Sequence, residues 1–249
     1  MIPLEAFKFY EVGGKIRDEL LGLTSKDVDY VAVPSEELLH KYTSPEQMFE
    51  VLTEHLRNKK FEIFLITSDC YTIRAKFPAD HRYSGTADFV MARKELGYIP
   101  GTRTPIVIPG TLRDDLERRD FTVNALAKDP DTGEIIDLFN GIEDLKYRIL
   151  RTPLAPWITM NDDPLRILRA IRFAITKRFT ICGALSDAIL EYEYSEGMSV
   201  VSESRIREEL NKCFKFDTLK TLEYLSYYSD LRDYIFKSTN LWLKPTNEK

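Results

Sequence analysis

Short apolar runs separated by polar turns fill the first 137 residues of the chain. Runs of this kind are typical of strands, whereas apolar positions three and four residues apart indicate helices. The pattern predicts strands at residues 7–12, 28–33, 61–66, 71–75 and 86–91. It predicts helices at residues 15–21, closed by Gly22, and at residues 44–58, with Ser44 as the N-cap and Pro45 at the first position.

Helical spacing replaces the strand pattern after residue 137. Helices are predicted at residues 162–177, 183–193 and 202–213, and one more helical pair fits between residues 217 and 236. The predicted fold class is α+β, with a mixed-sheet head at 1–140, an all-α neck at 141–215 and a short helical C-terminal segment at 216–249. Residues 98–112 contain two Pro-Gly pairs and few strand or helix signals, so they are predicted to form a mobile loop.

Composition and charge narrow the range of functions. The net charge of −5 argues against a protein that grips nucleic acid with its whole surface, although a local basic strip is compatible with it. No run approaches the roughly 20 apolar residues that span a bilayer, and the first residues lack a secretory signal. We therefore expect a cytoplasmic protein with no membrane partner. The three cysteines and three histidines lack metal-ligand spacing, which argues against a disulfide framework or a zinc site.

A pair of glycines lies between the first predicted strand and helix. Gly13 and Gly14 would let the backbone approach a ligand closely, and the start of a helix offers N–H groups to phosphate. Arg17 would add a cation one turn into the helix. Taken alone, a Gly-Gly corner is most often a simple turn.

Two aspartates occupy alternate positions at the second predicted strand. Asp27 and Asp29 would project to the same side, roughly 7 Å apart. Two carboxylates on one face repel each other, and a pair of Mg²⁺ ions would remove that repulsion and suit phosphoryl transfer. The alternative is an exposed strand with two solvated aspartates, which the apolar residues 31–33 disfavour.

An arginine stripe follows a helical period in the predicted neck. Asp163, Arg166, Arg169 and Arg172 recur every three residues and would share one slanted face, beside an apolar stripe formed by Leu165, Leu168, Ile171 and Ile175. A guanidinium fork can address acceptors on cytosine or adenine. The alternative is a solvated basic face with a capping aspartate.

In their order, these motifs resemble the nucleotidyltransferase fold of the DNA polymerase β superfamily, and more closely the class II tRNA nucleotidyltransferases and bacterial-type poly(A) polymerases. The segments that carry the resemblance are VGGKIRDELLG (12–22), DVD (27–29), RRDFTVNALA (118–127), IDLFNGIEDL (136–145) and DPLRILRAIRF (163–173). The resemblance extends from about residue 9 to about residue 212.

The resemblance implies a role for each matching residue. Asp27 and Asp29 would be catalytic and would hold two Mg²⁺ ions. The residues implied to bind the triphosphate, the ribose and the base are Gly13, Gly14, Arg17, Arg119, Asp120, Asn124, Asp163, Arg166, Arg169 and Arg172. The charges at 118–120 could instead belong to a capped helix start, with Asp120 as the N-cap, and both roles are compatible.

A third carboxylate is expected as general base for an RNA 3′-hydroxyl. Asp88 is the candidate, because it resembles the aspartate that precedes the family's arginine–glutamate pair, here Arg93 and Glu95. The alternative is a plain strand-end aspartate, since metal coordination alone can lower the pKa of the hydroxyl. Candidate RNA contacts are the basic residues Lys146, Arg148, Arg151, Lys177 and Arg178.

The predicted function is template-independent addition of C and/or A from CTP and ATP to the 3′ end of tRNA or another RNA, with release of pyrophosphate. A poly(A) polymerase or an enzyme that adds only A or only CC remains open. Transfer to a non-RNA acceptor and a non-catalytic RNA-binding protein are further alternatives. The chain is expected to lack most of the helical body and tail that family members carry, and to act as a monomer or a homodimer.

Overall fold

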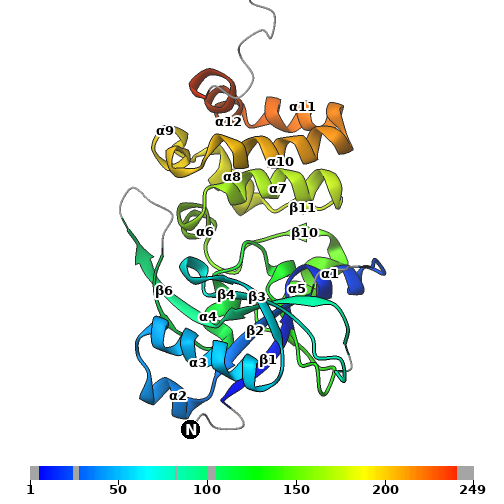
Figure 1. The fold of residues 1–249 in the computed structure, drawn as a ribbon. Helices are drawn as coiled ribbons and strands as arrows, with labels where there is room; N and C mark the ends of the chain where they lie inside the picture. The colour runs from blue at the N-terminus through cyan, green and yellow to red at the C-terminus, as the bar shows by residue number, and fades with distance from the viewer. Residues whose placement is uncertain (1–5, 25–27, 82, 100–104, 240–249) are drawn as a thin grey trace, which may run out of the picture. The chain divides into compact units, whose positions relative to one another are not determined.

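A seven-stranded mixed sheet forms the frame of the first part of the protein (Figure 1). The computed structural model describes residues 6–24, 28–81, 83–99 and 105–239. The sheet order is β3-β4-β5-β2-β1-β8-β9, in which only β2 and β5 run parallel. Its strands are β1 (Phe7–Val12), β2 (Asp29–Pro34), β3 (Glu62–Thr67), β4 (Thr72–Lys76), β5 (Thr86–Met91), β8 (Leu126–Lys128) and β9 (Ile135–Asp137).

The five predicted strands are all confirmed, each within one residue at either end. Strands β8 and β9 were not predicted, because three residues are too few to establish an alternating pattern. The prediction of an α+β fold with a mixed sheet is likewise confirmed.

Five helices accompany this sheet, namely α1 (Gly14–Leu20), α2 (Glu36–Lys41), α3 (Pro45–Asn58), α4 (Leu112–Glu117) and α5 (Gly141–Tyr147). Helix α3 confirms the predicted N-cap, because the Ser44 hydroxyl accepts a hydrogen bond from the Gln47 N–H at 3.4 Å. Gly22 takes a φ of 72° just after α1, as a helix-closing glycine does.

Alternate residues of β2 enter two separate cores. Tyr30 and Ala32 join the cluster that includes Leu52 of α3, whereas Val31 packs in the cluster that includes Leu116 of α4. Because side chains alternate along a strand, the side chain of Asp29 shares the α4 side of the sheet with Val31. The strand pattern therefore decides which face of the sheet carries an acidic group.

The prediction of a loop over residues 98–112 is wrong at residues 105–109, which form a strand, whereas residues 100–104 lie outside the described residues. Strands β6 (Arg93–Tyr98) and β7 (Pro105–Pro109) pair antiparallel as a separate two-stranded sheet, and α4 begins at Leu112. The second Pro-Gly pair allows the two strands to lie close together, because a Cβ on Gly110 would come within 2.6 Å of the Arg93 backbone. The strand was not predicted because Pro105 and Pro109 are typical of loops, whereas here they are the first and last residues of β7.

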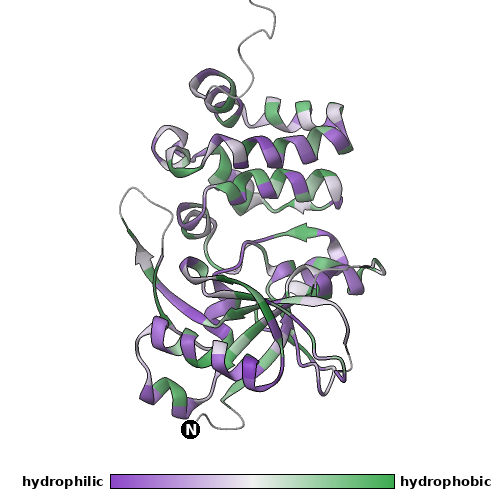
Figure 2. Ribbon diagram, in the orientation of Figure 1, coloured by the Kyte–Doolittle hydropathy of each residue, from purple (hydrophilic) through white to green (hydrophobic). Residues whose placement is uncertain are grey.

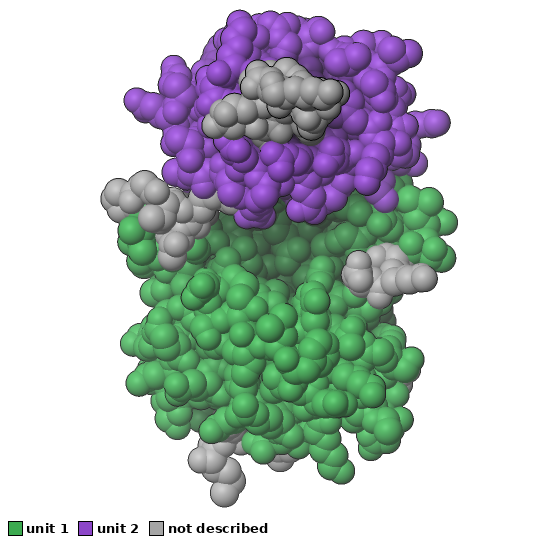
Figure 3. All heavy atoms as spheres, turned by 45° about the horizontal axis from the view of Figure 1, so that its top comes forward, with its two compact units in different colours: residues 1–99, 104–145 green, residues 100–103, 146–249 purple. Residues whose placement is uncertain are grey.

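Contacts divide the chain into two units, residues 1–99 with 104–145 and residues 100–103 with 146–249 (Figure 3). We call them the sheet unit and the helical unit. The helical unit contains α6 (Pro156–Asp162), α7 (Leu165–Thr176), α8 (Gly183–Leu190), α9 (Tyr194–Gly197), α10 (Glu203–Phe216), α11 (Thr218–Tyr227) and α12 (Ser229–Asp233), with a π-helical turn at Tyr234–Ser238.

Two details of the helical unit differ from the prediction. The helix predicted at 162–177 begins only at Leu165, because Asp163 adopts an extended backbone before Pro164, and Asp162 instead ends α6, which was not predicted. The unit is also not entirely helical, since β10 (Ile149–Leu150) and β11 (Thr180–Ile181) form a short parallel pair. Helices α7, α10 and α11 are each amphipathic, with hydrophobic and hydrophilic residues on different sides (Figure 2). None of the described helices is long and apolar enough to cross a membrane.

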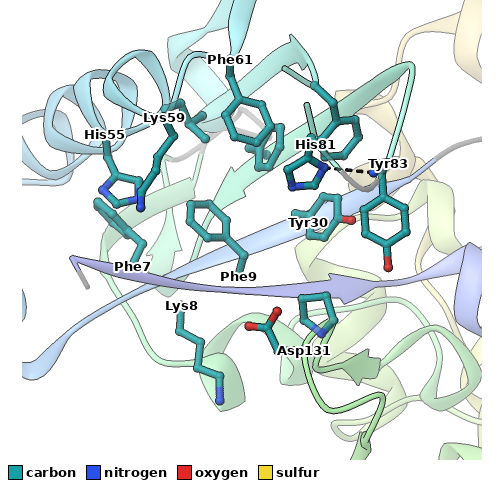
Figure 4. A pocket seen from close by; sticks show the side chains of 14 residues that line it. Phe7, Lys8, Phe9, Tyr30, His55, Lys59, Phe61, His81, Tyr83 and Asp131 are labelled. Carbon is teal, nitrogen blue, oxygen red and sulfur yellow. Dashed lines mark hydrogen bonds between the residues drawn. The ribbon is translucent and has the colours of Figure 1, made fainter. Parts of the chain in front are cut away.

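A cavity of about 690 Å³ lies on the α3 side of the sheet, away from the Asp29 side. Figure 4 shows the rings of Phe7, Phe9 and Phe61 around it, together with the imidazoles of His55 and His81. His55 is buried against Phe7 and Phe9, at ring-centroid distances of 5.6 and 5.8 Å. Burial, aided by the charge of Lys59, lowers the pKa of His55.

The lowered pKa of His55 predicts loss of stability in mild acid. The unfolded chain binds a proton on His55 near pH 6.5, whereas the folded chain binds it only at lower pH. The free energy of unfolding therefore falls as the pH drops below about 6.5, by at most about 1.4 kcal/mol per pH unit. Urea unfolding of wild type and His55→Asn between pH 5 and 8 measures this dependence. A variant of the exposed His40 should keep the wild-type slope; an unchanged slope in His55→Asn would contradict the assignment.

Candidate functional site

The corner between β1 and α1 brings three predicted site residues together. Gly13 takes φ 78° and ψ −138°, a backbone conformation that favours glycine. A Cβ at Gly13 would lie 3.1 Å from Nη1 of Arg119 and 3.9 Å from Oδ2 of Asp29. The missing side chain thus leaves the space into which a cation and a carboxylate reach.

Asp29 is the first residue of β2 and lies opposite Val12 of β1 and Asp88 of β5. Neighbouring strands are about 4.8 Å apart, so Asp29 and Asp88 are adjacent on one face of the sheet. Asp27, the predicted partner of Asp29, lies outside the described residues. Its predicted alignment with Asp29 stays a prediction.

Asp88 forms a two-bond ion pair with Arg74 of β4. The Nε and Nη2 atoms of Arg74 donate to the two carboxylate oxygens, each at 2.6 Å. Arg74, Asp88 and Asp29 therefore form a row across three neighbouring strands. This fork geometry fixes the orientation of the Asp88 carboxylate.

Asp115 of α4 holds Arg119 beside the glycine corner. Its Oδ2 accepts hydrogen bonds from Nη2 and Nε of Arg119 at 2.8 and 3.2 Å, and its Oδ1 accepts one from Arg118. Asp115 is completely buried, and burial raises its pKa. The two guanidinium groups outweigh burial and hold the pKa of this carboxyl well below its ordinary value.

The same ion cluster reaches the β6–β7 hairpin. Glu95 of β6 lies 3.6 Å from Arg118 and 3.4 Å from Arg93. Arg93 is buried and donates to the Cys70 carbonyl at 2.6 Å. Ion pairs through Glu95 therefore connect the start of β6 with Arg118.

A second set of hydrogen bonds, which passes through the side-chain amide of Asn124, secures Arg17. Its Nη1 donates to Oδ1 of Asn124 at 2.5 Å, and Nδ2 of Asn124 donates to Oδ1 of Asp120 at 2.8 Å. Asp120 also accepts from the Phe121 N–H at 2.9 Å, and Arg17 pairs with Asp18 at 2.9 Å. The structure thus joins three of the predicted nucleotide-binding residues in one buried chain of hydrogen bonds.

Residues 136–145 pack against the turn that carries Asn124. Asp137 accepts hydrogen bonds from the N–H groups of Gly141 and Ile142, at 2.8 and 2.9 Å, and so fixes the start of α5. A Cβ on Gly141 would lie only 2.2 Å from the Thr122 carbonyl oxygen. The glycine is therefore required for α5 to lie against the turn that carries Asn124.

In the helical unit, α7 presents the predicted arginine stripe. Arg166, Arg169 and Arg172 are half-buried, whereas all four residues of the predicted apolar stripe are buried. Asp163 accepts from the Leu165 N–H at 3.1 Å, and Arg166 donates to the Thr159 carbonyl at 3.2 Å.

The last two arginines of the stripe have structural contacts of their own. Arg172 pairs with buried Glu209 of α10 at 2.6 Å, which fixes α7 against α10. The guanidinium of Arg169 lies 5.9 Å from the centre of the Phe173 ring. The stripe and the glycine corner belong to different units of the chain.

The candidate RNA contacts cluster in part. Arg148 donates to the Lys177 carbonyl at 3.3 Å, and its own carbonyl accepts from the Thr180 N–H at 2.7 Å. Arg178 follows Lys177 directly, and Arg151 follows β10. Lys146 instead lies 5.4 Å from the centre of the Tyr147 ring.

Several residues with evident roles were missed by the sequence reasoning. Asp115 had a usable signal, since it precedes Arg118 and Arg119 by three and four residues on a helical pattern. Arg74 and Glu209 had none, because strand register and helix pairing bring them to their partners. Tyr192 was also missed; burial and the nearby Asp163 raise its pKa to about 12, so the phenol keeps its proton.

The described residues hold no group of three or more His, Cys, Asp or Glu side chains placed to bind a metal ion. Asp29 and Asp88 are nevertheless adjacent carboxylates, and Mg²⁺ prefers such oxygen ligands. The donor type therefore fits a magnesium site, to which Asp27 would add the third carboxylate.

Comparisons with known proteins agree with these features. Residues 9–151 match the family described as the poly(A) polymerase head domain. The chain is 33% identical over 235 residues to tRNA nucleotidyltransferase cca2 of Schizosaccharomyces pombe, covering 90% of this chain and 47% of that protein. It also resembles solved structures of CCA-adding enzymes. For that of Bacillus stearothermophilus with CTP, the TM-score is 0.66 at 25% identity, covering 88% of this chain and 47% of the other.

A CCA-adding enzyme of Thermotoga maritima, complexed with tRNA, gives a TM-score of 0.67 at 26% identity, covering 96% of this chain and 50% of the other. The chain thus spans about half the length of the relatives that it matches. The extent of the family match confirms the resemblance found in the motifs. The protein belongs to the poly(A) polymerase head-domain family, and within that family it is similar to class II tRNA nucleotidyltransferases.

Proposed function

We propose that the protein is a metal-dependent, template-independent nucleotidyltransferase. It would add C and/or A from CTP and ATP to the 3′ end of tRNA and release pyrophosphate. The observation that carries this proposal is the approach of Asp29 and Arg119 to the bare Gly13 corner. The names of the relatives, which include CCA-adding enzymes crystallised with CTP and with tRNA, support the choice of nucleotide and acceptor.

In this proposal the sheet unit binds the triphosphate. Arg119, fixed by Asp115, places a guanidinium beside Gly13, and Arg17 lies next to Gly14. Both arginines are held before any ligand arrives, so little side-chain entropy is lost on binding. Preorganised cations of this kind also stabilise charge that develops on phosphate oxygens in the transition state.

Asp29, together with Asp27 and Asp88, would hold Mg²⁺. The bound ions would lower the pKa of the attacking 3′-hydroxyl and neutralise the departing pyrophosphate. Asp88 is the candidate base, because it lies beside Asp29 on the same face of the sheet and Arg74 fixes its carboxylate in place. Arg74 would have to release one oxygen for that step.

The arginine stripe of α7 would recognise the base. Arg166 is anchored to the Thr159 carbonyl, which fixes the position of its guanidinium. The protonated phenol of Tyr192, near Asp163, adds a hydrogen-bond donor to the same region. Asp163 and Arg166 together offer acceptors and donors that suit both cytosine and adenine.

The decisive experiment offers Mg²⁺, labelled CTP or ATP, and a tRNA that lacks its terminal residues. Elongated tRNA supports the proposal, and incorporation from CTP alone, ATP alone or both separates CCA addition from CC-only, A-only and poly(A) synthesis. Label on a small molecule would favour a non-RNA acceptor. No incorporation, with RNA still bound, would favour a non-catalytic RNA-binding protein.

Replacing Asp29 should abolish the reaction without unfolding the protein. Asp29→Asn removes a charged metal ligand while keeping the shape of the side chain, so we expect a loss in kcat of at least about 10²–10³-fold. Labelled-nucleotide incorporation gives the rate, and a thermal melt checks the fold. The matched control is Asp80→Asn at an exposed aspartate of the same unit, which should retain wild-type activity. Wild-type turnover by Asp29→Asn would refute the assignment.

Replacing Asp115 should release Arg119. Asp115→Asn leaves two guanidinium groups without their buried counter-charge, so we expect a destabilisation of about 3 kcal/mol. Because Arg119 loses its fixed position, the KM for CTP should also rise. Urea unfolding and steady-state kinetics measure the two effects. Asp114→Asn, at the half-buried capping residue of the same helix, should cost only about 1 kcal/mol and leave KM unchanged. Equal effects of the two substitutions would argue against the role.

A further inference from the structure

A groove of about 280 Å³ lies between β11 and α11 in the helical unit. Thr180 and Ile181 form one wall, and Ser186 contributes from α8. The other wall comes from Lys220, Glu223, Tyr224, Tyr227 and Tyr228. The α11 residues of this wall are three, four and seven positions apart, so they share one face of the helix.

Tyrosine rings dominate the groove. The ring of Tyr224 is stacked on that of Tyr228 at an angle of 19°, and the ring of Tyr227 meets Tyr228 edge-on at 4.9 Å. Tyr228 is buried, and its hydroxyl is 3.1 Å from the hydroxyl of Ser186. Tyr227 is supported by this fixed neighbour and is nevertheless 60% exposed. An aromatic ring that is both supported and exposed is a stacking surface.

Cations flank the wall formed by β11. Arg178 precedes Thr180 by two residues, and Lys177 precedes Arg178. On the paired strand β10, Arg148 and Arg151 are the two flanking residues, and the Arg148 carbonyl accepts the Thr180 N–H. The carboxylate of Glu223 in the groove is paired with Lys220 at 2.8 Å. The groove thus combines aromatic rings in its lining with cations that stand next to its β11 wall along the two paired strands.

We propose that this groove binds an unpaired nucleotide of the RNA acceptor. The base stacks on Tyr227, and the adjoining phosphates contact Arg178 and Arg148. Stacked aromatic rings beside a track of cations are the usual means of holding single-stranded nucleic acid, and they tolerate any base. The inference rests on the proposed function, to which it adds an RNA contact outside the nucleotide site.

Another exposed aromatic of the helical unit provides a matched control. Trp157 is 63% exposed, but the cavity it lines contains Asp187, Glu191, Glu193 and Glu196 and no lysine or arginine. RNA phosphates should avoid that surface. The two sites therefore differ in charge while they share an exposed ring.

The test measures RNA binding by fluorescence anisotropy, with a labelled tRNA that lacks its terminal residues and with a labelled single-stranded oligoribonucleotide. Tyr227→Ala should weaken binding of both by about 5- to 150-fold, the range for loss of one stacked base. Tyr227→Phe keeps the ring and should bind like wild type, as should Trp157→Ala. Arg178→Gln should lower the slope of log K against log salt concentration by about 0.7–0.9.

The outcomes separate this inference from the proposed function. If wild type extends tRNA and Tyr227→Ala, shown to be folded by its thermal melt, binds RNA as tightly as wild type, the groove is not an RNA site although the function stands. The same conclusion follows if Tyr227→Phe is as weak as Tyr227→Ala, because the ring would then be irrelevant. If wild type neither binds nor extends RNA, the proposed function itself fails.

Discussion

The close approach of Arg119 and Asp29 to Gly13 is the contact on which the candidate site depends. A Cβ at this position would lie 3.1 Å from the Arg119 guanidinium, which would have to shift by a few tenths of an ångström, and 3.9 Å from the Asp29 carboxylate, an ordinary contact. The positive φ of Gly13 also favours a glycine, and it turns the chain sharply from β1 into α1. The cation and the carboxylate therefore reach the same corner of the chain from α4 and β2.

Two internal networks keep this arrangement rigid. Buried Asp115 restrains Arg119 from α4, while the side-chain amide of Asn124, itself hydrogen-bonded to Asp120, restrains Arg17. The difference is physically sensible, since a buried carboxylate between two arginines is strongly held in its charged form, whereas an amide adds no charge. Because the arginines are already oriented, little conformational entropy is lost when a triphosphate binds.

Much of the molecule could be predicted from the sequence, and the failures have definite causes. The Gly-Gly corner, the five longer strands and the amphipathic face of α7 follow from local spacing. The β6–β7 hairpin was missed because Pro105 and Pro109 read as loop residues although they stand at the ends of a strand. The pair of Arg74 with Asp88 depends on the register between β4 and β5, which local pattern does not reveal. Likewise, the tyrosines of α11 become a surface only when β11, about 40 residues earlier, forms the opposite wall.

Nucleotide affinity of Gly13→Ala tests the central claim most directly, because the new methyl group would press on Arg119. Gly133→Ala is the matched control: Gly133 has a φ of 76°, close to the 78° of Gly13, but its Cβ would meet no atom within 4 Å. Both substitutions place a side chain at a positive φ, but only the one at Gly13 adds a contact with the candidate site, so calorimetric titration with CTP compares the two positions directly. The account predicts at least about tenfold weaker CTP binding by Gly13→Ala, as expected for a displaced charge-assisted hydrogen bond, and unchanged binding by Gly133→Ala. Equal affinity of the two variants for CTP would contradict it.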